Sequence, residues 1–296
     1  MSDRGQAALT RVARIGDRAF FRFTSDLPLP WSVKRRWTEI VATANRVPGD
    51  VKRERIELAG IPTDRLEPAD GGEGALLYFH GGAYVQGSPR VQRVAAARLA
   101  KGAGATAYAP DYRLAPEHRF PAAYDDCLAA YAALAESGDR VVLAGDSAGG
   151  GLALAVAIGA RDAGLPAPAG TFLICPWLDL AADRSHGPDT DPILSRAAVT
   201  NGAAVYLDGA DPSDPRCSPI RGDLAGLPPI LIHTAAEDPI RPDAEALAAR
   251  ATEAGVESEL EQFPLWHDFH LHAGALALAD AALAKGATFA RDRLRG

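Results

Sequence analysis

Residues 141–150 read VVLAGDSAGG, and this stretch decides how the rest of the sequence is interpreted. Residues 141–143 are an apolar run typical of a buried strand, and an alanine-rich helical pattern begins near Ala148. Between them stands the Gly-x-Ser-x-Gly motif of residues 145–149. A strand before the motif and a helix after it predict a sharp turn that exposes Ser147. Gly145, Gly149 and Gly150 supply the small neighbours that such a turn requires.

Short apolar runs, turns and helical patterns alternate on both sides of this motif. We expect eight strands: Arg53–Leu58, Thr63–Glu67, Ala75–Phe79, Ala105–Ala109, Arg140–Ala144, Thr171–Cys175, Pro229–Thr234 and Glu257–Phe263. We expect helices at Pro89–Ala100, Ala122–Glu136, Ala148–Asp162, Asp243–Ala254 and Leu271–Arg291. From the third strand onward, strands and helices alternate. This order predicts an α/β fold with a mostly parallel sheet that helices cover on both faces.

Two segments lie outside the alternating pattern. Residues 1–45 show two amphipathic helical stretches, with apolar residues at Ala7, Ala8, Val12, Ile15, Ala19 and Phe20 and then at Trp31, Val33, Trp37, Ile40 and Val41. Residues 178–220 show no strand pattern and contain one short helical stretch, Arg196–Tyr206. Long excursions between core strands are commonly functional. We therefore expect residues 46–296 to form the main domain, with residues 1–45 and part of 178–220 forming a helical cap.

Composition excludes several classes of protein. The chain has 296 residues, of which 47% are hydrophobic and 23% charged, as in ordinary globular proteins. Its 31 basic residues are scattered and its net charge is -7, which argues against nucleic acid as a partner. The most apolar run, residues 148–160, is shorter than the roughly 20 residues that span a bilayer, so we expect no membrane insertion.

The cysteines and the glycine patterns narrow the choice further. The chain has three cysteines, Cys127, Cys175 and Cys217. Because their number is odd and they form no Cys-x-x-Cys pair, the sequence predicts neither a disulfide framework nor a zinc site. Charged residues interrupt the N-terminal stretch, which therefore lacks the apolar run of a signal peptide. We expect a cytoplasmic protein without metal. No Gly-x-Gly-x-x-Gly motif follows the first strand, which argues against a dinucleotide cofactor.

A nucleophilic serine needs a base within hydrogen-bond reach, and histidine is the expected one. His267 lies in a loop between the last expected strand and the C-terminal helix, from which it can reach a nucleophile on a neighbouring strand. His270 and His272 are nearby competitors. His233 lies within an apolar strand and is interpreted as a core residue, and His80 as a residue that shapes a glycine-rich turn.

An acid is expected to orient the base. Asp238 follows the seventh strand and gives the chain order serine, aspartate, histidine. Glu237 and Asp243 lie close to it in the sequence, and Asp179, after the preceding strand, is an alternative at a different strand end.

Acyl transfer also requires donors for an oxyanion, and backbone N–H groups are suited to this because they are fixed before the charge develops. The residues His80-Gly81-Gly82-Ala83-Tyr84 follow the third strand. The N–H groups of Gly81 and Gly82, together with that of Ala148 at the start of the helix, predict a hole with three donors.

These motifs together resemble the hormone-sensitive-lipase family of α/β-hydrolases. The resemblance covers about residues 75 to 290 and rests on the motifs at 80–84, 111–117, 145–150, 237–239 and 266–267. It implies an α/β-hydrolase fold with a helical cap and hydrolysis of carboxylic esters without a cofactor. It also implies a triad of Ser147, Asp238 and His267, an oxyanion hole made by Gly81, Gly82, Ala83 and Ala148, and a structural role for residues 112–117 in supporting the oxyanion loop.

One residue departs from the family pattern. Ala83 stands where the family usually has a third glycine after the histidine. Because the N–H group is retained and a methyl group is small, we expect the hole to survive with a slightly narrower acyl site.

The resulting hypothesis is a serine carboxylesterase that acts on uncharged small-molecule esters with short to medium acyl chains. Candidates for an apolar substrate pocket are Tyr84, Trp177 and Leu178, with Trp31 and Trp37. A lactonase or an amidase would use the same machinery. A non-catalytic binding protein of the same fold is the alternative from another class, against which the presence of His267 argues. A homodimer is the macromolecular assembly we consider.

Overall fold

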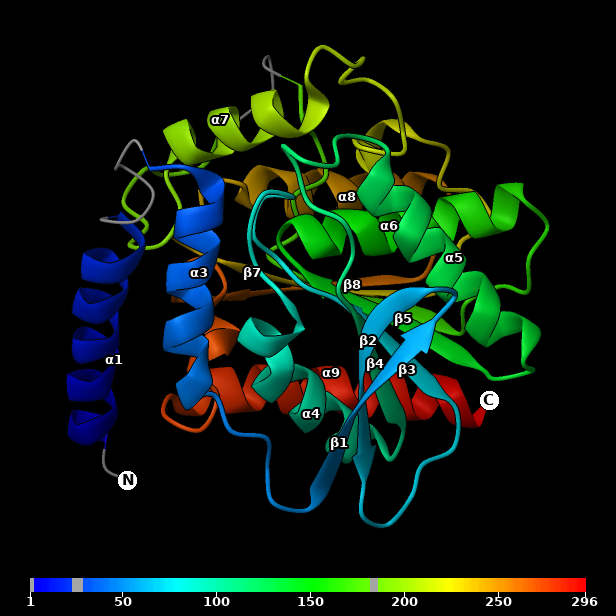
Figure 1. Cartoon of the computed structure of the whole chain (residues 1–296), viewed down its shortest axis with the longest axis horizontal. Coiled ribbons are helices and arrows are strands. Elements are labelled where there is room, and N and C mark those ends of the chain that lie inside the picture. Colours follow the sequence, from blue (N-terminus) through cyan, green and yellow to red (C-terminus); the bar gives the residue numbers. More distant parts are fainter. Residues whose placement is uncertain (1–2, 23–28, 182–185) are drawn as a thin grey trace.

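The computed structural model describes residues 3–22, 29–181 and 186–296, and its centre is one eight-stranded sheet (Figure 1). The strands are β1 (Val51–Leu58), β2 (Ile61–Pro68), β3 (Ala75–Phe79), β4 (Thr106–Pro110), β5 (Val141–Asp146), β6 (Gly170–Ile174), β7 (Ile230–Ala235) and β8 (Ser258–Phe263). Their order is β1-β2-β4-β3-β5-β6-β7-β8, and β2 runs in the opposite direction to the other strands. The predicted mostly parallel sheet is confirmed, with each predicted strand end within two residues of the observed one.

Helices cover both faces of the sheet (Figure 1). One hydrophobic core lies under α5 (Ala122–Glu136), α6 (Ala148–Asp162) and α8 (Arg241–Glu253), and a second lies under α4 (Pro89–Ala103) and α9 (Ala277–Arg295). The predicted bounds of α5 and α6 are confirmed. The last helix begins later than predicted, because a 3-10 turn, η4 (Phe269–His272), is followed by Gly274 with a φ of 95°. The left-handed backbone at Gly274 interrupts the helical pattern.

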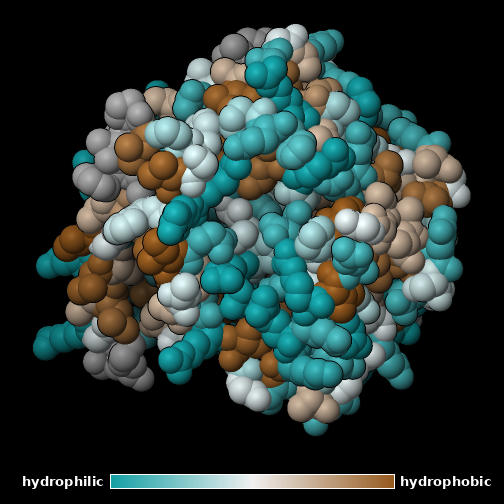
Figure 2. Space-filling view, viewed as in Figure 1, coloured by the Kyte–Doolittle hydropathy of each residue, from teal (hydrophilic) through white to brown (hydrophobic). Residues whose placement is uncertain are grey.

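The N-terminal residues form the two helices expected, but their apolar residues are not packed as expected. The elements are α1 (Asp3–Asp17), the π-helix η1 (Arg18–Arg22), α3 (Trp31–Val41) and the 3-10 helix η2 (Ala42–Ala44). Large apolar side chains on α1 and α3 are exposed: Leu9, Val12, Ile15, Val33, Trp37, Ile40 and Val41. Figure 2 shows this apolar surface as brown patches over the N-terminal helices. The periodicity correctly indicated helices, but much of the apolar stripe faces outward.

Polar contacts attach these helices to the rest of the molecule. Arg14 of α1 forms two hydrogen bonds with the carboxylate of Glu237, at 2.5 and 2.6 Å. The buried carboxylate of Asp17 accepts a hydrogen bond of 2.8 Å from Nε1 of Trp266. In α3, Nε of Arg35 donates to the carbonyl oxygen of Val85 at 2.7 Å. The helices are thus held at loops that follow the carboxyl ends of β3, β7 and β8.

The excursion after β6 contains the short helix expected in it. This helix is α7 (Arg196–Leu207), which Figure 1 shows on the same side of the molecule as α3. A 3-10 turn, η3 (Pro219–Arg221), follows, and residues 182–185 of the predicted cap segment lie outside the described residues. Among the helices that the structure describes, none is long and apolar enough to cross a membrane.

The contact between α9 and the sheet predicts opposite effects for the same substitution at two helical glycines. A Cβ atom at Gly286 would lie 2.2 Å from the buried ring of Phe172, whereas one at Gly16 in α1 would meet nothing within 4 Å. Alanine stabilises a helix by about 0.5–1 kcal/mol relative to glycine, but overpacking a core costs roughly 1–3 kcal/mol. We expect Gly286→Ala to lower the free energy of unfolding in urea and Gly16→Ala to leave it unchanged or raise it. A Gly286→Ala protein as stable as the original chain would contradict this packing.

Candidate active site

Ser147 lies in the sharp turn between β5 and α6. Its φ is 52° and its ψ is -120°, a backbone conformation that is costly for a residue with a side chain. The turn is fixed by hydrogen bonds of 2.9 Å from the Ser147 N–H to Ile174 and from the Trp177 N–H to Ser147. A Cβ at Gly145 would lie 2.3 Å from the carbonyl oxygen of Gly149, and one at Gly149 would lie 2.0 Å from that of Phe79. Close backbone contacts therefore require the glycines on which the sequence interpretation relied.

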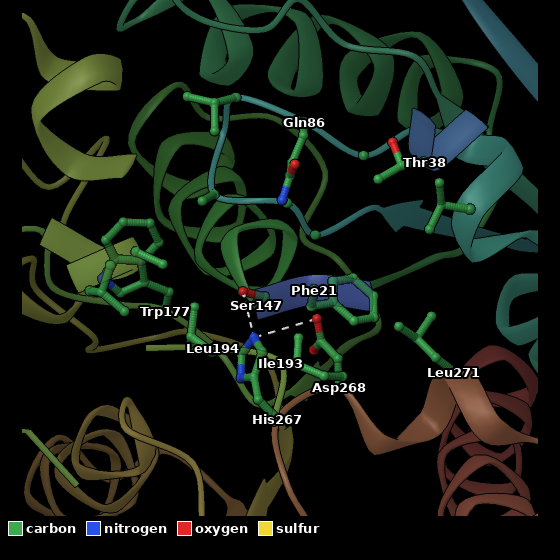
Figure 3. Close-up of a pocket in the computed structure, with 18 of the residues that line it drawn as sticks. Phe21, Thr38, Gln86, Ser147, Trp177, Ile193, Leu194, His267, Asp268 and Leu271 are labelled. Carbon is green, nitrogen blue, oxygen red and sulfur yellow. Dashed lines mark hydrogen bonds and ion pairs between the residues drawn. The ribbon is translucent and has the colours of Figure 1, made fainter. Parts of the chain in front are cut away.

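The structure brings together the serine, the histidine and the acid that the sequence singled out. Nε2 of His267 lies 2.9 Å from Oγ of Ser147, and Nδ1 lies 2.9 Å from Oδ2 of Asp238. Figure 3 shows the His267 ring below Ser147. Because a carboxylate oxygen can only accept, Nδ1 carries the proton in the neutral imidazole, and Nε2 is then left to accept the hydrogen of the serine hydroxyl.

The alternative histidines are engaged elsewhere. Nε2 of His270 lies 3.9 Å from the Asp146 carboxylate, and burial lowers the pKa of His270 to about 3. Nε2 of His272 lies 2.6 Å from the carboxylate of Asp17, the residue through which α1 also contacts Trp266. His233 is fully buried in β7, where burial lowers its pKa to about 3, in agreement with its interpretation as a core residue.

The alternative acids also have other partners. Glu237 pairs with Arg14, and Asp179 pairs with Arg221 through two hydrogen bonds. The Asp243 carboxylate accepts from the backbone N–H groups after β6, among them that of Leu178 at 2.7 Å.

A further aspartate, which the sequence pattern did not indicate, supports the histidine. Oδ2 of Asp191 accepts the backbone N–H of His267 at 2.6 Å, while Oδ1 accepts those of Ile193 and Leu194. Burial raises the pKa of Asp191 to about 6, although the nearby His267 opposes this shift. The only sequence signal was an Asp-Pro turn in the excursion after β6, which does not indicate contact with a loop 76 residues away.

Buried acids determine the charge of His267. Burial lowers the pKa of His267, but the carboxylates of Asp238 and Asp268 raise it by more, so that its pKa lies well above the usual value. Asp268 lines the cavity in front of Ser147, and its Oδ2 lies 3.4 Å from Nε2 of His267. Burial raises the pKa of Asp268 well above its usual value.

The loop after β3 lines the same cavity as Ser147, but not all of the expected backbone donors are available. The Gly81 N–H already donates to Oδ2 of Asp146 at 2.9 Å, so the expectation that Gly81 donates to an oxyanion is wrong. Within the described part of the chain, the N–H groups of Gly82, Ala83 and Ala148 form no hydrogen bond. These three groups are left as donors.

His80 and Tyr112 shape this loop from behind. Their rings stack with centroids 4.1 Å apart, and the Tyr112 hydroxyl donates to the carbonyl oxygen of His80 at 2.6 Å. Nδ1 of His80 donates to the carbonyl oxygen of Gly81 at 2.8 Å. Both residues thus hold the backbone of the loop, as the sequence analysis expected of His80 and of residues 112–117.

A cavity of about 110 Å³ opens in front of Ser147. It is lined mainly by apolar side chains, among them Phe21, Trp31, Val85, Trp177, Ile193, Leu194, Val199 and Leu271. Figure 3 shows Trp177 and Asp268 on opposite sides of Ser147. Trp31 and Trp177 line the cavity as expected, but three other expected residues do not.

These three residues pack elsewhere for identifiable reasons. The ring of Tyr84 stacks on Tyr206 with centroids 4.0 Å apart, and Leu178 is fully buried in the core. The side chain of Trp37 lies on the outer surface of α3, where its ring stacks on Phe20.

Among the residues that the structure describes, two groups of buried side chains have ligand atoms close enough together to hold a metal ion. They are Cys175, His267 and Asp268, and Asp146, Asp268 and His270. In each group one member already forms hydrogen bonds within the site, His267 with Ser147 and Asp146 with Gly81.

Comparisons with known proteins agree with this architecture. A family model for the α/β-hydrolase fold matches residues 76–271. LipR of Mycobacterium tuberculosis (strain ATCC 25618 / H37Rv) is 42% identical over 246 residues, which are 81% of this chain and 80% of LipR. An acetyl-hydrolase of Streptomyces hygroscopicus is 42% identical over 233 residues, 75% of this chain and 77% of that protein.

A solved structure extends the likeness to nearly the whole chain. The crystal structure of an esterase from the bacterial hormone-sensitive lipase family superposes with a TM-score of 0.89 at 32% identity, and the match covers 99% of both chains. The chain therefore belongs to the α/β-hydrolase family, within it to the bacterial hormone-sensitive lipase group, and is a carboxylic ester hydrolase.

Proposed function

We propose that Ser147 is the nucleophile of this esterase, His267 its general base and Asp238 the acid that orients the base. Oγ of Ser147 attacks the ester carbonyl carbon while Nε2 of His267 takes the hydroxyl proton. The tetrahedral intermediate collapses, the bond to the alcohol oxygen breaks, and His267 returns the proton to that oxygen. Water then attacks the acyl-enzyme by the same relay and releases the acid. The two contacts of 2.9 Å around the His267 ring carry this assignment.

The N–H groups of Gly82, Ala83 and Ala148 are the proposed oxyanion donors. They are not used by other acceptors in the described chain, and Ala148 begins α6, whose N-terminus favours negative charge. Donors that are fixed before the charge develops stabilise the transition state without a cost of reorganisation.

The proposed substrates are uncharged esters with short to medium acyl chains. The cavity lining contains no lysine or arginine among the described residues, so no permanently charged side chain is placed there to bind an acidic substrate. The similarity to an acetyl-hydrolase supports a short acyl group. We place the acyl chain on the side of Trp177, because Trp177 and Val199 also line a second cavity of about 350 Å³.

We further propose that residues 1–45 and part of 178–220 form the cap over the main domain. Phe21, Trp31 and Thr38 come from the first segment, and Ile193 and Leu194 from the second, and all five line the cavity.

Location in the cytoplasm is supported by Cys127, Cys175 and Cys217, which are buried free thiols. A homodimer stays a prediction.

Removal of the nucleophile tests the central assignment. We expect Ser147→Ala to reduce turnover of a p-nitrophenyl ester by about 10⁶-fold, because removing the serine of a triad removes the covalent route. An organophosphate should add one phosphoryl group to Ser147 in the original chain, located by peptide mass analysis. The exposed Ser137 offers a matched control, since Ser137→Ala should leave both results unchanged. Labelling of another residue, or full activity of Ser147→Ala, would disprove the role of Ser147.

The charge of His267 predicts the pH dependence. An imidazolium cannot accept the serine proton, so kcat/KM should fall as the pH drops through the pKa of His267. Because Asp238 and Asp268 raise that pKa, the inflection should lie above 6.5. Asp268→Asn removes the negative charge that Asp268 carries beside a protonated His267 and should move the inflection to lower pH. A profile measured with a non-titrating ester checks both statements, and an inflection below 6.5 in the original chain would contradict them.

Acyl preference tests the position of Trp177. In a series of p-nitrophenyl esters we expect the highest kcat/KM at about two to four acyl carbons, since the cavity in front of Ser147 is smaller than one that holds benzene. Trp177→Ala joins this space to the second cavity and should shift the optimum to longer chains. Trp37→Ala removes an exposed tryptophan of α3 and should not. An optimum that Trp177→Ala leaves unchanged would place the acyl chain elsewhere.

A further inference from the structure

Asp268 differs from the other acids around Ser147 in having an unused oxygen. Its side chain lines the cavity although the residue is only 6% exposed. Oδ2 lies 3.4 Å from Nε2 of His267, and Oδ1, which is buried, forms no hydrogen bond with any residue that the structure describes. Figure 3 shows the Asp268 carboxyl group beside the His267 ring. In contrast, the carboxylates of Asp146, Asp191 and Asp238 accept from nearby donors.

Backbone conformation does not explain an aspartate at this position. The φ of Asp268 is 53°, in the left-handed region that glycine, asparagine and aspartate tolerate. Glycine or asparagine would satisfy the backbone without placing a carboxyl group in the site. A buried carboxyl group with unused hydrogen-bonding capacity costs free energy, so a functional partner is the better explanation.

The position of Asp268 indicates which part of the substrate this partner belongs to. In the proposed mechanism, Nε2 of His267 returns its proton to the leaving oxygen, so the leaving alcohol must pass close to Nε2. Asp268 contacts that same nitrogen, and Trp177, at the proposed acyl side, lies across Ser147 from it. The carboxyl group of Asp268 therefore faces the alcohol part of a bound ester.

We propose that Asp268 is a specificity-determining residue whose carboxyl group forms a hydrogen bond with a hydroxyl group of the leaving alcohol. The enzyme then prefers monoesters of diols and polyols to esters of alkyl alcohols of the same size. The inference rests on the proposed function, because it takes Ser147 and His267 as the reacting pair.

The protonation of Asp268 fits a neutral partner. Burial raises its pKa and favours the uncharged acid, whereas a protonated His267 opposes this rise and favours the carboxylate. A hydroxyl group can pair with either form, because it donates to a carboxylate and both donates to and accepts from the acid. A carboxylic acid offers one O–H donor and one carbonyl acceptor, and a hydroxyl group can both accept and donate. An alkyl chain at the same place would leave both functions of the acid unpaired.

Two acetate esters with equal numbers of non-hydrogen atoms test the proposal. 2-Hydroxyethyl acetate and propyl acetate differ in a terminal hydroxyl against a terminal methyl group. The measured quantity is the ratio of their kcat/KM values, divided by the ratio of their rates of alkaline hydrolysis, which removes the difference in leaving-group reactivity. We expect this normalised ratio to favour the hydroxyl ester in the original chain.

The variants are Asp268→Gly and Asp268→Asn, because both residues tolerate the left-handed backbone. The Gly variant should lower the normalised ratio about fivefold, the factor that one hydrogen bond of typical strength contributes. The Asn variant retains a donor and an acceptor and should keep part of the preference. Asp208→Gly is a matched control, since Asp208 also has a positive φ, of 46°, but lies at the end of α7 and does not line the cavity.

The ratio separates this inference from its rivals. An unchanged ratio in Asp268→Gly, with both esters still hydrolysed, would overturn the inference and leave the proposed function intact. The inference would also be overturned if Asp268→Gly moved the pH inflection equally for both esters and changed nothing else. Asp268 would then act only through its electrostatic effect on His267. Failure of the proposed function would look different, because Ser147 would then take up no organophosphate.

Discussion

The carboxylate of Asp146 is the interaction on which the geometry of the site depends. Asp146 is the last residue of β5, directly before Ser147, and it is fully buried. Its Oδ2 accepts from the Gly81 N–H at 2.9 Å and from Nε2 of Gln92 at 2.6 Å, and its Oδ1 accepts from the Tyr78 hydroxyl at 2.7 Å. One side chain thus joins the turn at Ser147 to β3, to α4 and to the loop after β3. The proposed oxyanion donors are thereby fixed relative to Oγ of Ser147 before a substrate binds, as electrostatic catalysis requires.

This arrangement concentrates buried acids around one imidazole. Burial raises the pKa of Asp146 and of Asp191 to about 6 each, since carboxylates lose hydration in the interior. Hydrogen bonds from backbone and side-chain donors offset part of that cost. Asp238 and Asp268 favour a positive charge on His267, and a positive imidazole forms in the reaction when Ser147 gives up its proton. Burial of these acids costs free energy in the resting protein. In the proposed mechanism, the acids that contact His267 stabilise the imidazolium that forms when Ser147 loses its proton.

The sequence predicted what depends on strand ends and missed what depends on contacts between distant loops. The eight strands and the parallel order placed Ser147, Asp238 and His267 at one edge of the sheet, because the carboxyl ends of parallel strands meet there. The use of Gly81 was wrongly predicted, because the motif shows a backbone donor but not that a neighbouring carboxylate occupies it. Asp191 lies in a segment without periodicity, and the outward position of Trp37 follows from the tertiary placement of α3. Each of these depends on the relative position of segments that are remote in sequence.

The attachment of α1 connects the proposed cap with the loops that carry the acid and the base. Arg14 binds Glu237, the neighbour of Asp238, and Asp17 binds Trp266, the neighbour of His267. The first pair is about one-third exposed, and ion pairs of that kind contribute at most about 1 kcal/mol. The second is buried, and loss of its acceptor would leave the indole N–H of Trp266 unpaired, at a cost of roughly 1–3 kcal/mol. The buried contact therefore dominates the attachment, and α1 supports the loop of His267 from outside while η1, which continues it, places Phe21 in the cavity.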